Sequence, residues 1–285
     1  MSTSRLREAI RTFRRNTLGV VGLGILCAFV IIALFANQIS PYDPYERVGK
    51  PFEKPSASHL LGTNDIGQDL FSEIVHGSRI SLGLGFVAAV IAMTIGTLVG
   101  VVAGYSGGIV DSILMRITDV VLVIPFLPLM ILMSAVLGPS FWNLVIVLSV
   151  IIWARPARVI RAQVLSLKER GHVVAARATG GTVRHILFHH VIPAVLPISL
   201  AQLILATRST ILIEASLSFL GLGDPLSKSW GMILYYAQAR GAFLTGAWVW
   251  WILPPGLLIT AAVLGFAFTG YALEETVNPR LRRGR

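Results

Sequence analysis

Charged residues are scarce in this sequence: they make up 13% of its 285 residues, whereas hydrophobic residues make up 54%. An average soluble domain carries about one-quarter charged residues. The composition therefore excludes an ordinary water-soluble fold. The apolar residues are grouped into runs close to the roughly 20 residues that a membrane-spanning helix needs. We predict an all-α, polytopic membrane helix bundle.

Several chemical signatures are also missing. The single cysteine, Cys27, excludes an internal disulfide and leaves the redox compartment open. No G-x-x-x-x-G-K-[ST] segment occurs, so any nucleotide must be bound by a partner. His185 and His189 share a helix face, but Ile186 stands where a zinc protease carries glutamate. Without a recognisable nucleophile either, the sequence predicts no catalytic residues, no metal and no cofactor.

Six apolar runs are candidate membrane spans. They cover residues 18–35, 80–102, 120–137, 142–152, 198–220 and 248–268. The first, within a predicted span at 18–36, is followed by no signal-peptide cleavage site. The fourth is short, so five spans remain an alternative to six. Six spans place both termini on the same side of the membrane.

The net charge of +10 is distributed beside the ends of these runs. Arginines gather in segment 1–17, in the internal loop 155–192 and in the tail 276–285. The positive-inside rule places these three segments in the cytoplasm, and it places segment 37–79 outside. We therefore expect a lipid environment for the basic residues and no nucleic-acid partner.

Two finer patterns accompany the spans. In segment 37–79, apolar residues at helical spacing follow the candidate capping residues Thr63, Asn64 and Asp65 and predict an amphipathic interfacial helix. These residues are Ile66, Leu70, Phe71, Ile74 and Val75. In the second span, small residues recur at every fourth position and predict a close helix contact. They are Ala88, Ala92, Gly96, Gly100 and Gly104.

The fifth run carries two charges, Arg208 and Glu214. Their insertion cost of about +5 to +7 kcal/mol roughly offsets the apolar residues of the run, so this span belongs inside a bundle. Six positions apart, the two lie about 240° apart around a helix and do not pair directly. Each is either a structural group or part of a translocation path. A secondary transporter or channel using this pair is one candidate function.

The internal basic loop has a recognisable pattern. Residues 168–179 are compatible with a helix, Gly180 and Gly181 interrupt it, and Thr182 can cap a second helix over 183–190 that stops before Pro193. The small residues of the first helix form a slim surface that fits a groove on a soluble partner. The alternative is an ordinary solvated loop near lipid headgroups.

The stretch HVVAARATGGTVRHILFHHVIP resembles the cytoplasmic coupling motif of ATP-binding-cassette (ABC) importer permeases, E-A-A-x-x-x-G followed by an apolar stretch and proline. Ala175, Ala176, Gly180 and Pro193 match it, and Val174 replaces the glutamate. Further segments resemble the dipeptide, oligopeptide and nickel permease family, specifically the C-type subunit of the pair. They are HLLGTNDIGQDLFSEIVHGSRISL, in which Gln68 replaces an arginine, GYSGGIVDSILMRITD, ASLSFLGLGDPLSKSWG and NPRL.

This resemblance implies a type I ABC importer permease fold, with a transmembrane domain at 80–275 that contains the coupling loop 155–192. It implies a multi-pass inner-membrane protein that moves peptides or a related solute. Its partners would be a second homologous permease, cytoplasmic ATP-binding subunits and an extracytoplasmic substrate-binding protein. The residues expected to contact the ATPase are Val174, Ala175, Ala176, Arg177, Gly180 and Pro193.

Overall fold

The computed structural model describes residues 11–277, and every regular element named within this range is helical. The basic residues at 1–10 and 278–285 lie outside the described residues. The first half contains α2 (Thr17–Leu34), α3 (Ala36–Ile39), α4 (Leu70–Ser106), α5 (Gly108–Val123), α6 (Phe126–Leu137), α7 (Phe141–Ile152) and α8 (Ala154–Lys168). The second contains α9 (Gly171–Ala178), α10 (Val183–Ile186), the π-helix η1 (Leu187–Val191), α11 (Ile192–Phe219), α12 (Trp230–Ala239), α13 (Ala242–Thr245), α14 (Trp248–Trp251) and α15 (Leu253–Val277).

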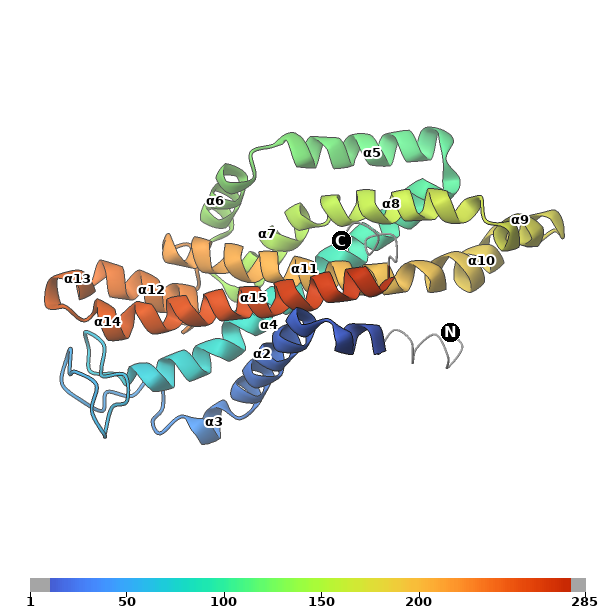
Figure 1. The fold of residues 1–285 in the computed structure, drawn as a ribbon. Coiled ribbons are helices and arrows are strands. Elements are labelled where there is room, and N and C mark those ends of the chain that lie inside the picture. The colour runs from blue at the N-terminus through green and yellow to red at the C-terminus, as the bar shows by residue number, and fades with distance from the viewer. Residues whose placement is uncertain (1–10, 278–285) are drawn as a thin grey trace.

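The molecule is elongated, and its long helices follow the long axis (Figure 1). Helix α9 lies at one end, and α13 with the loop that precedes α4 lies at the other. Four continuous helical stretches are long and apolar enough to cross a membrane, and two bent helix pairs bring the number to six. This confirms the predicted all-α bundle, with six spans when each bent pair is one crossing.

The third span ends at Leu137 as predicted, but its start and its continuity differ from the prediction. It begins at Gly108 instead of residue 120, and α5 and α6 meet at 88° instead of forming one helix. Pro125 explains the break, because the residue before a proline is driven to extended backbone, as Ile124 is. The earlier start includes Asp111 and Asp119, whose charges are paired with arginines of α8.

The amphipathic stretch predicted as a separate interfacial helix is instead the first part of α4. Helix α4 runs for 37 residues without a break, and Asp69 caps it by accepting a hydrogen bond from the backbone N–H of Ser72 at 2.8 Å. Ile66 lies in the preceding loop. Since no proline interrupts 70–106, the helix continues directly into the membrane span.

The small-residue ridge on α4 packs against the α7–α8 pair, as predicted. A Cβ added to Gly100 would lie 2.6 Å from the carbonyl oxygen of Ala157, and one added to Gly104 would lie 2.8 Å from Cβ of Val164. The backbones of α4 and α8 therefore touch, and any larger side chain would separate them.

Helix α8 occupies the first part of the predicted loop 155–192. It continues the short fourth span after a 41° bend near Trp153, which is why run 142–152 looked too short to cross. Arg158 pairs with Asp119 and Arg161 with Asp111, both on α5, so these arginines bind carboxylates and do not extend to headgroups. What remains of the loop is α9, the turn after it, α10 and η1.

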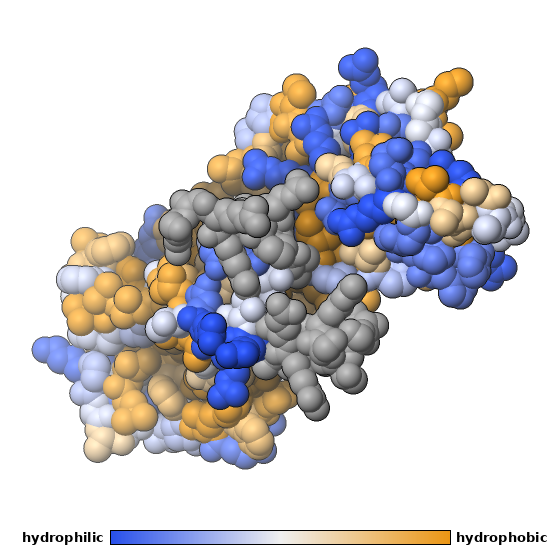
Figure 2. Space-filling model, turned by 45° about the vertical axis from the view of Figure 1, so that its right-hand side comes forward, coloured by the Kyte–Doolittle hydropathy of each residue, from blue (hydrophilic) through white to orange (hydrophobic). Residues whose placement is uncertain are grey.

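Polar and apolar surfaces are segregated along the molecule. Large hydrophobic side chains are exposed along α2, α5 and α6, among them Leu18, Ile109 and Val136. Hydrophilic side chains gather at the end that carries α9 (Figure 2). Apolar flanks between polar ends are the distribution of a membrane-spanning subunit.

Candidate functional site

Helix α9 is ended by a glycine turn. Gly180 has φ +80°, its N–H donates to the carbonyl of Arg177 at 3.1 Å, and the N–H of Gly181 donates to the carbonyl of Ala176 at 3.0 Å. This pair of bonds is a Schellman motif, which needs a left-handed residue directly after the helix. The predicted break at Gly180 and Gly181 is confirmed.

The motif residues divide between two sides of α9. Val173 is fully buried, and Ala176 packs against the same apolar cluster, which also contains Ile186. Val174 is 48% exposed, at the position of the family glutamate. Ala175, Arg177 and Ala178 are exposed with it. The outer side of α9 is therefore slim and open, while its inner side anchors it.

Pro193 lies apart from α9, in the first turn of α11. The second helix does not stop before it, because α10, η1 and α11 form one stretch from Val183 to Phe219. A proline is tolerated here since the π-helix directly precedes it and changes the hydrogen-bond register that its missing N–H would otherwise break. Pro193 thus belongs to α11, whose Val195 packs in the same cluster as Val173 of α9, and not to the exposed side of α9.

Helix α9 is fastened to the membrane helices through α8. The cluster beneath it combines Val164 and Leu167 of α8 with Val101 of α4 and Val195 of α11. Lys168, at the last turn of α8, donates to the carbonyl of Tyr105 at 2.8 Å. One apolar cluster therefore joins α9 to α4, α8 and α11.

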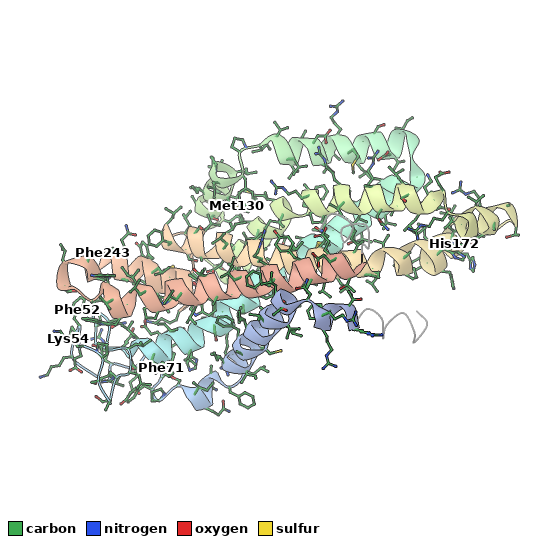
Figure 3. All side chains as sticks on the ribbon, viewed as in Figure 1. Phe52, Lys54, Phe71, Met130, His172 and Phe243 are labelled. Carbon is green, nitrogen blue, oxygen red and sulfur yellow. The ribbon has the colours of Figure 1, made fainter. Side chains whose placement is uncertain are left out.

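The histidines of this end form a loose group. The rings of His185 and His189 stack with centroids 4.3 Å apart, and His172 of α9 lies 5.9 Å from His190. Figure 3 shows His172 at the α9 end of the molecule, far from Lys54 and Phe243 at the other. Within residues 11–277, no group of three or more His, Cys, Asp or Glu has the geometry of a metal site.

Arg208 and Glu214 are not brought together. Arg208 is half-buried and lines a cleft of about 460 Å³. The cleft lies between α11, the bend where α7 meets α8, and residues 108–137, which form α5 and α6 and are called the α5–α6 arm below. Glu214 is buried elsewhere on α11, where Ser218 donates to its Oε1 at 2.8 Å and its Oε2 has no partner. Glu214 is not among the residues that line the cleft.

A buried polar network at the opposite end was not predicted from the sequence. Nζ of Lys228 donates to Oε1 of Glu73 and to Oε1 of Gln68, each at 2.6 Å. Asn64 also donates to Glu73, at 2.8 Å. Gln68, which replaces the family arginine, also donates to the carbonyl of Tyr45 at 2.8 Å. The network ties the loop before α4 to the segment before α12.

Two families match the chain. Residues 96–283 match the family described as binding-protein-dependent transport system inner membrane component. Residues 4–56 match the N-terminal transmembrane domain of oligopeptide transport permease C. Together the two matches cover most of the sequence, including α9 and the cleft.

Named relatives match over nearly their full length. The dipeptide transport system permease protein DppC of Alkalihalophilus pseudofirmus is 36% identical over 99% of this chain and 92% of its own. The oligopeptide transport system permease protein OppC of Bacillus subtilis is 34% identical over 99% and 92%. The DppC protein of Haemophilus influenzae is 32% identical over 98% and 96%.

These matches favour the resemblance noted in the coupling motif over a secondary transporter or channel. The relatives are permease subunits, and the matched family is an inner-membrane component. The chain therefore belongs to the family of binding-protein-dependent transport permeases, the multi-pass membrane subunits of ABC importers.

Proposed function

We propose that this chain is the C-type permease of a peptide importer and that α9 is its coupling helix. The names of its relatives support a dipeptide or oligopeptide substrate. The chain would work with a second homologous permease, cytoplasmic ATP-binding subunits that hydrolyse ATP, and an extracytoplasmic substrate-binding protein. The chain itself would carry no catalytic residues.

The observation that carries this proposal is the two-sided construction of α9. Its outer side offers Val174, Ala175 and Arg177 to a partner, while Val173 and Ala176 hold it on the cluster of α4, α8 and α11. A solvated loop needs no such anchor. A lever that converts closure of an ATPase into motion of membrane helices needs both an exposed contact and a rigid base.

The orientation follows from the same assignment. With α9 in the cytoplasm, segments 1–17 and 276–285 are cytoplasmic and segment 37–79 is extracytoplasmic, in agreement with the charge distribution. The Lys228–Glu73 network then lies on the side from which the binding protein delivers substrate. Alternating access moves the bundle between an opening at that end and one near α9.

Crosslinking tests the coupling assignment directly. In the assembled importer, with Cys27 replaced by serine, Ala178→Cys should form a disulfide or bismaleimide crosslink with an ATP-binding subunit. Ser56→Cys, at the opposite end, is the matched control and should form none. If no position from 173 to 181 crosslinks to an ATPase subunit while the importer remains active, α9 is not the coupling helix.

A further inference from the structure

Two arginines in the membrane cleft have no carboxylate partner within the described residues. Arg155 is exposed at the start of α8, and Arg208 is half-buried on α11. The polar contact of Arg208 is the hydroxyl of Tyr271 at a long 3.5 Å, with the guanidinium 5.9 Å from the ring centroid. A single long contact leaves most of its five donors free.

The next arginines on α8 show what a paired arginine looks like in this protein. Arg158 binds Asp119, and Arg161 binds Asp111, so α5 and α8 run antiparallel. In that register Arg155 lies beyond Asp119, toward the end of α5. The residues there that line the cleft are apolar: Val121, Leu122 and Ile124. Helix α5 therefore supplies a carboxylate to Arg158 and to Arg161 but none to Arg155.

The cleft is built for an anion of modest size. No aspartate or glutamate lines it, and its other polar side chains are Gln202 and Ser209. A guanidinium stays charged at any relevant pH, and a charge within a membrane domain needs a compensating group. The volume of about 460 Å³ is within the usual range for small-molecule sites.

We propose that Arg208, together with Arg155, binds the C-terminal carboxylate of a peptide during its passage. This inference rests on the proposed function, since it takes the transported solute to be a peptide. A carboxylate matches the planar guanidinium with two parallel hydrogen bonds. Gln202 can bond the adjacent peptide group, and the apolar walls accept varied side chains. The cleft would thus recognise the C-terminal carboxylate and the peptide group beside it, which peptides of different sequence share.

Chemical protection of a cysteine in the cleft tests this without transport. The full importer carries Ser209→Cys and Cys27→Ser and is placed in nanodiscs of phosphatidylcholine alone. The rate of maleimide modification at residue 209 is followed by mass spectrometry of this chain, with millimolar trialanine or its C-terminal amide. Trialanine should slow modification several-fold. The amide lacks the charge-assisted hydrogen bonds and should bind roughly tenfold more weakly, so it should have little effect at the same concentration.

The variant Arg208→Gln should abolish the protection by trialanine, whereas Arg208→Lys should keep part of it. Arg184→Gln, which removes a basic residue outside the cleft, is the control and should leave protection unchanged. Equal protection by trialanine and its amide, protection by neither, or full protection in Arg208→Gln would each overturn the proposal.

An anionic lipid headgroup is the other source of the same chemistry. If phosphatidylglycerol in the nanodiscs slows modification while trialanine has no effect in phosphatidylcholine, the occupant is lipid and the peptide proposal is wrong. ATP-driven uptake of trialanine into proteoliposomes, with the binding protein present, distinguishes a failure of the carboxylate site from a failure of the proposed peptide transport. Uptake without protection rejects only the carboxylate site, whereas loss of both rejects peptide transport as well.

Discussion

The guanidinium of Arg161 on α8 donates two hydrogen bonds to the carboxylate of Asp111 on α5, from Nε and from one terminal nitrogen, each 2.6 Å long. Since α8 leads directly to α9, and α5 leads to the arm that borders the cleft, this pair links the proposed coupling helix to the proposed substrate site.

Breaking that pair should loosen the α5–α6 arm. Asp111→Asn is expected to lower the unfolding free energy of the importer by about 2 kcal/mol, because a charge-assisted bidentate contact is lost. Arg116→Gln, exposed on the same helix, should change it by less than about 0.5 kcal/mol. Thermal unfolding of the purified complex measures both. A smaller loss for Asp111→Asn than for Arg116→Gln would refute the link.

The α4–α8 contact should not accept a larger side chain. Gly100→Leu places carbon atoms where the backbone of Ala157 lies, so we expect a loss of about 3 kcal/mol or failure to assemble. Gly24→Leu is the control, because a Cβ there meets nothing within 4 Å. The yield of assembled complex on size exclusion reports the outcome, and normal assembly of Gly100→Leu would show that the packing argument is wrong.

The outer side of α9 should be sensitive to bulk without affecting the fold of this chain. Ala175→Trp is expected to keep membrane insertion and stability within about 0.5 kcal/mol, yet to weaken ATPase association and abolish uptake. Ala175→Ser is the matched control and should be active. Ala176→Trp is a poorer test because Ala176 packs on the apolar cluster, so its loss would have two causes. Val174→Glu, which restores the family residue at an exposed position, should be tolerated.

The Lys228–Glu73 pair should behave as a buried ion pair. Lys228→Met alone leaves the Glu73 carboxylate without its cation and is expected to cost about 3–5 kcal/mol. Adding Glu73→Gln should recover most of that loss, because neither charge then remains buried. Thermal unfolding compares Lys228→Met and the double variant with the parent protein. Equal melting temperatures for all three would show that the pair does not contribute to stability.

Cysteine labelling checks the orientation. Since Lys228 is only partly exposed and is held in the network, Leu226→Cys, at a position 82% exposed, is the better reporter beside Ser56→Cys. In a background with Cys27→Ser, both should react with an impermeant maleimide in spheroplasts, and Arg170→Cys should react only after lysis. Labelling of Arg170→Cys in intact spheroplasts would invert the proposed topology.

Features that depend on neighbours along the chain were determined by the sequence alone. The length of the apolar runs was enough to predict an all-α membrane bundle. The four-residue spacing of the small residues from Ala88 to Gly104 was enough to predict a close helix contact. Gly180 and Gly181 were enough for the end of α9. Each depends on residues a few positions apart, whose geometry in a helix is known in advance.

Only the tertiary structure decided which charges meet. Asp111 and Arg161 are 50 residues apart in the sequence, and Glu73 and Lys228 are 155 apart, so no local pattern could pair them. The same holds for the fifth span, where one helix places Arg208 in a cleft and buries Glu214 away from it. The bend at Pro125 could be expected from the sequence, but the 88° angle between α5 and α6 could not. A buried charge is placed by partners from distant segments, and the sequence does not order those segments in space.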